Sequence, residues 1–284
     1  MKLLLIGLIL FCIGNNAFGQ KTISDQKVLD TVSYRFVYDV QAKVFENSNL
    51  RKSDEHWLDI GKKGISYYYS AWQMRNIQIH DSIRNIGGSM NDVFRVKYEQ
   101  GVEPSNFLYF IFKNYPLTGQ QTVDYASMDL FQYQEPMDLN WNFVEGDTII
   151  LNHPCQKAIC NYHGKTWIAF YATDIPISDG PWKLSGLPGL ILRAYDLSDS
   201  FLFNCVGIYQ NVGGIIAMMR SNRKITTPQK VHETTREIEK DPNAYMKAKG
   251  QNVTTLDEKG RPINLGKILS NMAHYESYSS GDKK

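Results

Sequence analysis

The chain has 284 residues with a formal net charge of +2, and 21% of its residues are charged while 12% are aromatic. This composition excludes an intrinsically disordered protein, and the near-neutral charge argues against a nucleic-acid partner or capture by an anionic lipid surface. The sequence shows no internal repeat and no low-complexity linker, so we expect one large domain rather than two small ones.

Residues 1–19 have the layout of a secretory signal peptide. Lys2 precedes an apolar run from Leu3 to Ile13, and the segment ends with the small residues of Ala17-Phe18-Gly19. The run is much shorter than the roughly 20 residues that span a bilayer, and no longer apolar run follows. Bulky residues before Cys12 argue against a lipid anchor. We therefore expect cleavage after Gly19, export to the periplasm or cell envelope, and no transmembrane segment.

The N-terminal half is predicted to consist of strands and one helix. Apolar spacing that places Trp72, Ile79 and Ile83 on one face predicts a helix over 71–86, which Gly87-Gly88 ends. Two short strands around residues 61–64 are expected to form a hairpin. The strands are expected at 32–45, 57–60, 65–69, 107–112, 123–128 and 130–133.

The sequence of the middle of the chain predicts β-hairpins. Glu145-Gly146-Asp147 is expected to be a tight turn between strands at 142–144 and 148–151. His163-Gly164 is expected to form the two-residue turn of the next hairpin, with glycine supplying a positive φ. This turn sets the register, and apolar residues on both faces suggest a hairpin covered on both sides. The expected partners are Cys160 with Trp167, Ala158 with Ala169, Gln156 with Tyr171, Ile159 with Ile168 and Cys155 with Ala172.

The last third of the chain changes from strands to helices. A polar loop from Asp174 to Ser185 precedes a hairpin with strands at 189–195 and 201–208. Thr227-Pro228 is expected to open a charged surface helix, because threonine is a favoured N-cap residue and proline is accepted in the first turn. Asp241-Pro242 interrupts this helix. We expect one β-rich domain over 20–275, surface helices within 227–249 and a frayed tail over 276–284.

Three cysteines remain after the expected cleavage, and their odd number leaves at least one thiol free or bonded to another molecule. Cys155 and Cys160 would lie about 16 Å apart along one straight strand, which is too far for a disulfide. Cys205 would lie about 14 Å away in a simple meander. We expect buried free thiols, although a bulge or a curled sheet would allow Cys205 to pair with either of the other two.

The densest cluster of backbone-shaping residues is Gly186-Leu187-Pro188-Gly189-Leu190-Ile191. Pro188 presets φ for the second position of a turn and Gly189 can supply a positive φ at the third, which predicts a type II turn over 187–190. The turn would deliver Leu190 and Ile191 into a buried strand. Gly186 would allow another group to approach the backbone closely.

The chain around this hexapeptide resembles the GLPGLI family of Bacteroidetes, which is named after it. The resemblance covers about residues 150–209, where Lys165 stands in place of a usual Arg and Phe170 in place of a common Trp. It implies an exported envelope protein whose partner is a TonB-dependent outer-membrane system or another envelope ligand, and it implies no catalytic residue. The further matches are Cys155-x-Lys157-Ala158, Gly164-Lys165-x-Trp167-x-Ala169-x-Tyr171, Ile175-Pro176, Gly180-Pro181 and Asp196.

The residue types of a metal site occur together at His153, Cys155, Cys160 and His163, which lie close together in the sequence. The predicted register places Cys160 on the face opposite His153 and Cys155, and the spacing matches no zinc pattern. Buried thiols and a histidine in a turn explain these residues better. We therefore expect no metal and no cofactor.

The loop before the hexapeptide holds the candidate binding residues Trp182, Lys183, Asp179 and Asp174. Aromatic side chains on a loop can form a ligand surface, and Trp182 fits that role or a place in the core equally well. Two of Asp174, Asp179 and Asp196 could form the acid pair of a hydrolase, whereas aspartates in loops more often cap turns. We therefore assign no catalytic residue.

These observations predict an α+β fold, with a curved, half-barrel-like antiparallel β-sheet of about eight to ten strands, one internal helix and C-terminal helices on its flank. The leading hypothesis is a non-enzymatic binding or accessory module that holds a lipid, peptide or outer-membrane partner in the concavity of the sheet. The alternatives are a hydrolase or metal-dependent enzyme using the Asp174–Asp196 region, and a purely structural subunit. An apolar pocket above about 300 Å³ would favour binding, and carboxylates or histidines converging in a cleft would favour an enzyme.

Overall fold

The structure is a computed structural model that describes residues 26–103, 105, 107–127, 129–219, 222–250, 264, 266, 273–276 and 278. The expected signal peptide and its cleavage site lie outside the described residues. Within the described ranges, no helix is long and apolar enough to cross a membrane.

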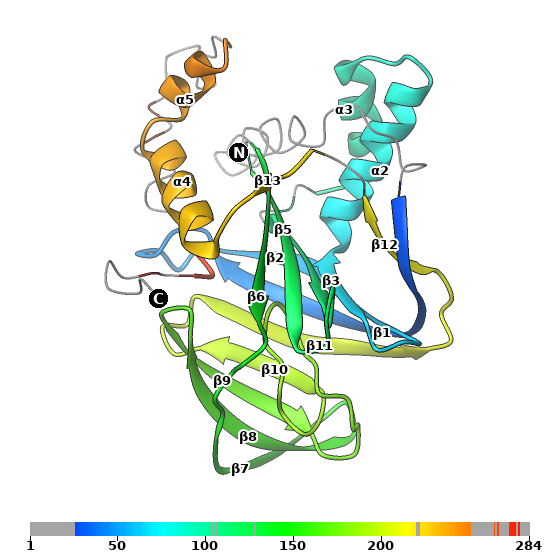
Figure 1. Cartoon of the computed structure of the whole chain (residues 1–284), viewed down its shortest axis with the longest axis vertical. Coiled ribbons are helices and arrows are strands. Elements are labelled where there is room, and N and C mark those ends of the chain that lie inside the picture. Colours follow the sequence, from blue (N-terminus) through cyan, green and yellow to red (C-terminus); the bar gives the residue numbers. More distant parts are fainter. Residues whose placement is uncertain are drawn as a thin grey trace.

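One large sheet organises the molecule (Figure 1). Thirteen strands of the described residues belong to it, more than the eight to ten expected from the sequence. The strands are β1 (Gln26–Lys43), β2 (Arg51–Gly61), β3 (Ser66–Ser70), β4 (Tyr109–Lys113), β5 (Gln120–Ala126), β6 (Leu130–Pro136), β7 (Asn142–Ile150), β8 (His153–Tyr162), β9 (Lys165–Ala172), β10 (Ile191–Asp196), β11 (Phe201–Gln210), β12 (Ile215–Met219) and β13 (Lys224–Ile225).

The strands are hydrogen-bonded in the order β13-β6-β5-β4-β3-β2-β1-β11-β10-β9-β8-β7, and β12 adds to β1. All pairs are antiparallel except the short contact of β13 with β6. No backbone pairing joins the two end strands among the described residues, so the sheet is open. We call β3–β6 with β13 the first wing and β7–β10 the motif wing; β2, β1 and β11 lie between them.

Four helices lie in the described residues: α2 (Ala71–Asn85), α3 (Met90–Glu99), α4 (Pro228–Lys240) and α5 (Pro242–Ala248). α2, α4 and α5 confirm predicted helices, with Thr227 capping α4 and Asp241 capping α5. The expectation of a single internal helix is wrong, because Ser89 and Asp92 form a reciprocal capping box that starts α3. Figure 1 shows α2 with α3 on one side of the sheet's upper end and α4 with α5 on the other.

The β8–β9 hairpin confirms the predicted register residue by residue. Cys160 lies opposite Trp167, Ala158 opposite Ala169 and Cys155 opposite Ala172. Both turn residues, His163 and Gly164, have positive φ angles of 48° and 73°, as a two-residue hairpin turn of type I′ requires. The turn chemistry alone therefore sets which side chains reach which face of the motif wing.

The predicted turn at Glu145-Gly146-Asp147 is wrong. β7 runs through these residues, and its pairing with β8 shifts between Val144 and Asp147. Gly146 has a φ of 138°, so it provides the backbone freedom of a bulge and the strand continues. The chain reverses later, at Leu151-Asn152, where both residues have positive φ. Glycine between charged residues suits a bulge as well as a turn, and the local sequence did not separate the two.

The main core lies between the wings and contains residues of both. It contains large buried side chains of the central strands together with Leu187, Leu190 and Ile191 of the hexapeptide. A smaller core lies on the opposite face, near α2 and β12. Side chains of the wings also meet directly, since Gln121 of β5 donates to Tyr162 at 3.1 Å and His163 lies 3.1 Å from Glu135 of β6. The loop that carries the hexapeptide enters this region.

Candidate functional site

The two glycines of the hexapeptide have roles opposite to those predicted. Gly189 does not have a positive φ, so the predicted type II turn is wrong. A Cβ atom at Gly189 would lie 1.8 Å from the carbonyl oxygen of Ala172, so this position requires glycine for close backbone contact. Gly186 has the positive φ, of 90°, and a Cβ there would make only ordinary van der Waals contact with Trp141, at 3.8 Å. Ile191 then starts β10 as a fully buried residue, which confirms the expected entry into a buried strand.

Trp182 lies in the core, which decides between its two predicted roles. Its side chain is 0% exposed, and its ring lies 5.2 Å from that of Trp167 and 5.9 Å from that of Tyr275. Its φ of 51° is unusual for a bulky residue. The indole Nε1 has no hydrogen-bond partner in the described part of the chain. Trp182 therefore anchors the loop to the sheet and offers no surface to solvent.

Lys183 is also fully buried. Its Nζ atom lies 2.5 Å from carboxylate oxygens of both Glu135 and Glu276 and donates to the Tyr133 hydroxyl at 2.9 Å. Burial raises the pKa of Glu135, but the charges of Lys183 and His163 outweigh it and lower this pKa to about 2. Glu276, the first residue of the expected frayed tail, is buried, and residues 277 and 279–284 of that tail lie outside the described residues. Lys183 thus joins the loop, β6 and the C-terminal segment.

Asp179 forms a second buried ion pair. Lys113 of β4 reaches its carboxylate at 2.6 Å and donates to the carbonyl oxygens of Gly180 and Leu184. The hydroxyl of Ser66 donates to the same carboxylate at 2.5 Å. Burial lowers the pKa of Lys113, while the Asp179 carboxylate raises it. A buried lysine is tolerated here because every one of its donors has an acceptor.

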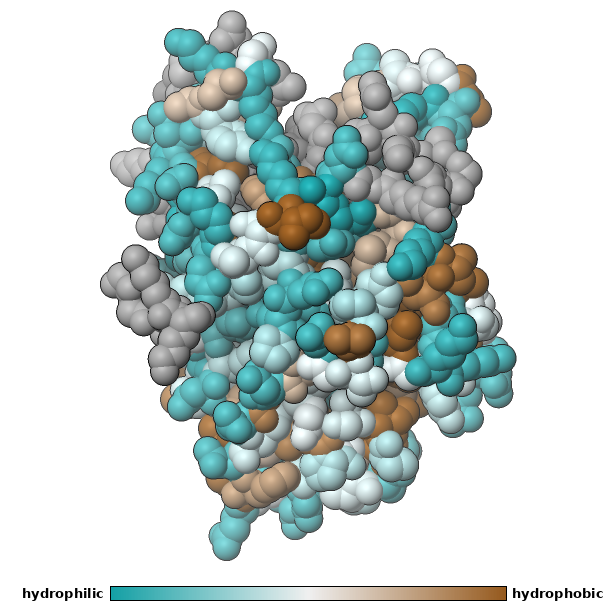
Figure 2. Space-filling model, in the orientation of Figure 1, coloured by the Kyte–Doolittle hydropathy of each residue, from teal (hydrophilic) through white to brown (hydrophobic). Residues whose placement is uncertain are grey.

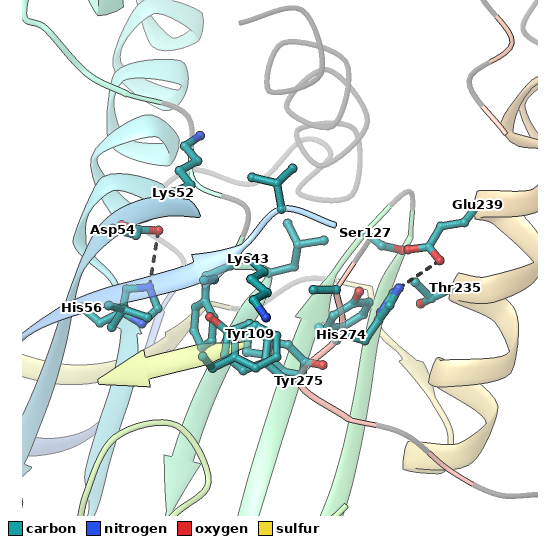
Figure 3. A pocket seen from close by; sticks show the side chains of 18 of the residues that line it. Lys43, Lys52, Asp54, His56, Tyr109, Ser127, Thr235, Glu239, His274 and Tyr275 are labelled. Carbon is teal, nitrogen blue, oxygen red and sulfur yellow. Dashed lines mark ion pairs between the residues drawn. The ribbon is translucent and has the colours of Figure 1, made fainter. Parts of the chain in front are cut away.

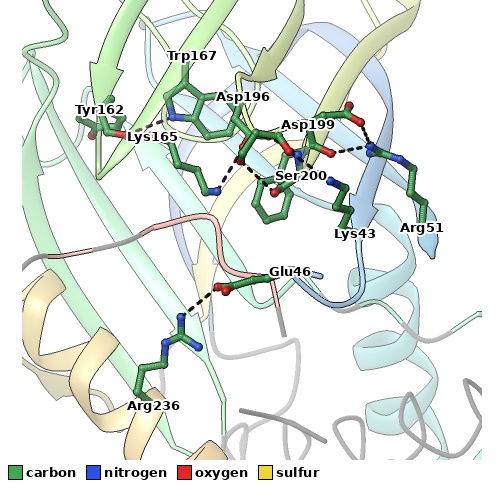
Figure 4. Close-up of polar contacts among 12 residues, drawn as sticks. Lys43, Glu46, Arg51, Tyr162, Lys165, Trp167, Asp196, Asp199, Ser200 and Arg236 are labelled. Atoms are coloured by element: carbon green, nitrogen blue, oxygen red, sulfur yellow. Dashed lines mark hydrogen bonds and ion pairs between the residues drawn. The ribbon is translucent and has the colours of Figure 1, made fainter. Parts of the chain in front are cut away.

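The other two aspartates, Asp174 and Asp196, lie apart from the Asp179–Lys113 ion pair, and each has its own partners. Asp174 is exposed and faces His153 at 2.9 Å. Asp196 is buried; it accepts from the backbone N–H groups of Ser200 and Phe201 and lies 3.3 Å from Lys165 (Figure 4). Asp196 therefore caps its turn, as loop aspartates commonly do. The loop aspartates do not form a shared acid pair, and a ligand in solvent can reach Asp174 directly but not Asp179, Trp182 or Lys183.

The three cysteines of the described chain are buried and free, which confirms the expectation from their spacing. Burial raises the pKa of both Cys160 and Cys205 to about 12, so these thiols stay protonated at neutral pH. Among the described residues, no three histidine, cysteine or acidic side chains gather as metal ligands would. His153 and His163, considered above for a metal, instead face Asp174 and Glu135.

A cleft that the sequence did not predict lies where residues of five strands, β1, β2, β4, β5 and β11, meet α4 and residues 273–275 (Figure 3). It encloses a cavity of about 100 Å³ with mostly apolar walls. Tyr275 forms one wall, and its ring stacks on that of Phe201 with centroids 4.0 Å apart. The cleft is lined by Val40, Ala42, Lys43, Val44, Lys52, Asp54, His56, Phe107, Leu108, Tyr109, Tyr125, Ser127, Phe201, Thr235, Ile238, Glu239, Ala273, His274 and Tyr275.

Asp54 and His56 of β2 form one polar corner of this cleft. The Nε2 atom of His56 lies 3.4 Å from Asp54, without hydrogen-bond geometry, and its Nδ1 atom lies 2.6 Å from the Tyr68 hydroxyl. Hydroxyl groups of Ser70 and Ser105 donate to the Asp54 carboxylate. Residues two apart on a strand share a face, so the Asp-x-His pattern is the sequence signal that could have found this pair.

Glu239 of α4 and His274 form a second polar corner. Their side chains face each other at 3.1 Å, again without hydrogen-bond geometry (Figure 3). The buried Ser127 hydroxyl has no hydrogen-bond partner among the described residues. Buried polar atoms are nearly always hydrogen-bonded in folded proteins, so a group of such atoms around one cavity requires an explanation. The five atoms are His56 Nε2, Ser127 Oγ, Thr235 Oγ1, Glu239 Oε2 and His274 Nε2.

A comparison with known protein families finds one match, which lies in the motif wing. Residues 156–193, from β8 into β10, match a family described as "Protein of unknown function (Porph_ging)". This match covers part of the segment that resembles the GLPGLI family, and membership of that family stays a prediction. No curated protein matches the chain.

Among solved structures, the chain is similar to PNGF-II in two crystal forms. The TM-scores are 0.42 and 0.43 with 12% and 11% identity, over 72% of this chain and 33% and 32% of PNGF-II. It is also similar to a DUF1329 family protein from Desulfovibrio piger, with a TM-score of 0.23 and 9% identity over 74% of this chain and 93% of that protein. The chain thus spans about a third of PNGF-II, and likenesses this weak indicate no function.

Proposed function

We propose that this protein is an exported binding module of the cell envelope, of the GLPGLI family, with the cleft as its binding site and a peptide segment as its ligand. The observation that carries the proposal is the group of five buried polar atoms around one apolar cavity that make no hydrogen bond within the described residues, three of them held in the ion pairs of His56 with Asp54 and of His274 with Glu239. Leaving a buried polar atom unpaired costs about 1–3 kcal/mol, so a ligand that supplies the missing partners is stabilised by the same amounts. Apolar walls with a few polar groups are typical of sites that bind and orient a ligand.

The size of the cavity favours a peptide over a whole lipid. Sites for complete small ligands enclose about 300–1,000 Å³, whereas a dry cavity of about 150 Å³ in another protein accepts benzene. The cavity of about 100 Å³ is smaller than the roughly 300 Å³ expected above of a pocket for a whole ligand, and its size suits one aromatic or branched side chain with a polar end. The remainder of such a peptide would lie along the concave face of the half-barrel-like sheet.

The contacts of the chain's own C-terminal segment at the edge of the cleft support a peptide as ligand. The backbone N–H of Ala273 donates to Val44, Tyr275 inserts among aromatic rings, and the Glu276 carboxylate pairs with Lys183. A backbone hydrogen bond, a buried aromatic ring and an ion pair are contacts by which extended peptides commonly bind proteins. A second segment binding beside residues 273–276 would extend the same interactions.

Native mass spectrometry of the protein purified from its own envelope tests the proposal. Ala42→Trp would fill the cavity, and Val206→Trp on the exposed face of β11 is the matched control. We expect the unchanged protein and Val206→Trp to retain a peptide or protein partner that Ala42→Trp loses, at equal melting temperatures. A co-purifying lipid would overturn the peptide assignment, and a clean monomer would overturn the binding role.

One observation favours an enzyme as the second candidate. Two histidine–carboxylate pairs, Asp54 with His56 and Glu239 with His274, line the same cavity and could act as acid and base in a hydrolysis. This location differs from the Asp174–Asp196 region that the sequence suggested. Chromogenic ester, amide and glycoside substrates test it: turnover that Glu239→Gln abolishes would support hydrolysis, and no turnover of any class would exclude these substrates.

A further inference from the structure

β7 is a long strand with one unpaired edge. It ends the sheet order, so its nine residues hydrogen-bond to β8 on one side only. The opposite end of the sheet is β13, which has two residues. In Figure 1, β7 lies at the lower end of the molecule, away from all four helices. An unpaired strand edge presents backbone N–H and C=O groups that another extended chain can pair with.

One face of β7 alternates apolar and acidic side chains. Phe143 lies opposite Ala158, Asp147 opposite Gln156 and Ile149 opposite Pro154, so all three belong to the same face of the sheet. Phe143 is 64% exposed and Ile149 is 75% exposed. The lower part of Figure 2 shows hydrophobic surface over this wing. Exposed apolar side chains beside an unpaired edge are typical of an interaction site.

The acidic residues of β7 select the kind of partner. Glu145 and Asp147 are both exposed near the bulge in the middle of the strand. Antiparallel pairing of β7 with the β7 of a second copy would bring these carboxylates together, and like charges on facing strands are destabilising. Bulges and charges also protect edges from such self-association, but protection does not explain why Phe143 and Ile149 are apolar and exposed.

We propose that β7 is a docking edge for an extended segment of a partner protein, in which a lysine or arginine stands between two apolar residues at alternate positions. The partner strand would extend the sheet beyond β7, place its basic side chain beside Asp147, and cover Phe143 and Ile149. This edge shares no residue with the cleft, so the proposal stands independently of the peptide assigned there.

Two short labelled peptides test the proposal on the whole mature chain. Each is capped and alternates threonine and valine, with lysine at the centre of one and glutamate at the centre of the other. We expect fluorescence anisotropy to show that the lysine peptide binds about tenfold more tightly. Asp147→Lys should reverse this preference, because it exchanges the charge on β7. Bound peptide should slow hydrogen exchange at the β7 amides.

Ile149→Lys and Leu197→Lys separate this edge from a general surface effect. Leu197 is 68% exposed in the turn between β10 and β11, so Leu197→Lys adds the same charge elsewhere and should leave binding unchanged. Ile149→Lys should weaken binding of the lysine peptide about tenfold. Equal binding of the two peptides, no change in β7 hydrogen exchange, or a dimer through β7 in sedimentation would overturn the proposal.

Discussion

The two wings of the sheet are stabilised in different ways. The motif wing depends on backbone pairing, short turns and the close contact of Gly189 with Ala172, all within one segment of the chain. The first wing is covered by helices and contributes charged side chains, Lys113 and Glu135, that reach across to the loop of the motif wing. Local sequence therefore determines the shape of the motif wing, whereas long-range ion pairs determine how the wings meet.

The largest effect is expected from a change that breaks the motif wing. Gly189→Ala would place a Cβ atom 1.8 Å from a backbone oxygen, so we expect a loss of stability of about 4 kcal/mol or more. Gly186→Ala would meet only an ordinary van der Waals contact with Trp141 and should lose only about 1–2 kcal/mol for its positive φ. Urea unfolding measures both. A greater loss for Gly186→Ala would contradict the roles assigned to the two glycines.

The next effect concerns the contact between the wings. Lys183→Met leaves the Glu135 and Glu276 carboxylates buried without their cation, and we expect the free energy of unfolding to fall by about 3–5 kcal/mol. Glu276→Gln keeps the pair of Lys183 with Glu135 and should cost about 1 kcal/mol. Thermal unfolding of the two variants compares them. Equal losses of stability in Lys183→Met and Glu276→Gln would contradict the role of Lys183 as the shared partner of both carboxylates.

A pH titration sharpens the same comparison. The folded-state pKa of Glu135, about 2, lies below its ordinary value of 4.5. The unfolded chain therefore binds a proton at a higher pH than the folded chain does. This part of the stability is complete above about pH 4.5 and is lost as pH falls towards 2. We expect acid unfolding in that window, with a weaker pH dependence in Glu135→Gln; an unchanged slope would exclude Glu135 as its source.

The smallest effect should come from the cysteines, which only fill space. In the folded protein we expect no thiol to react with Ellman's reagent at pH 8, because burial raises the pKa of Cys160 and Cys205 to about 12. Unfolding without a reductant should release all three thiols of the mature chain. Release of a single thiol would reveal a disulfide and contradict the arrangement of the strands.

The sequence predicted best those features that depend on neighbouring residues. The turn at His163-Gly164 sets the register of a whole hairpin, and Thr227-Pro228 starts α4 where expected. The prediction from sequence was wrong where one residue type is compatible with two structures. Gly146, for example, suits a bulge as well as a turn. The Ser89 capping box carried a signal for α3 that spacing of apolar residues did not.

The cleft and the buried lysines could not be predicted in the same way. Asp54 and Glu239 come from a strand and a helix that are far apart in the sequence, and only the completed sheet brings them to one cavity. Lys183 was expected at a binding surface because it lies beside Trp182 in the loop before the hexapeptide. Its burial depends on Glu135 and Glu276, and no local pattern connects those three residues.

The position of β1 also affects the kinetics of folding. β1 comes before every other described strand in the chain, yet it lies in the middle of the sheet, where Val40 pairs with Asp54 on one side and with Phe203 on the other. The first pairing is local, but the second must close a long loop, and such closure slows folding. We therefore expect the first wing to assemble early and to wait, with one side of β1 unpaired, until β11 has been synthesised. During that interval β1 is the segment most exposed to aggregation and most in need of a chaperone.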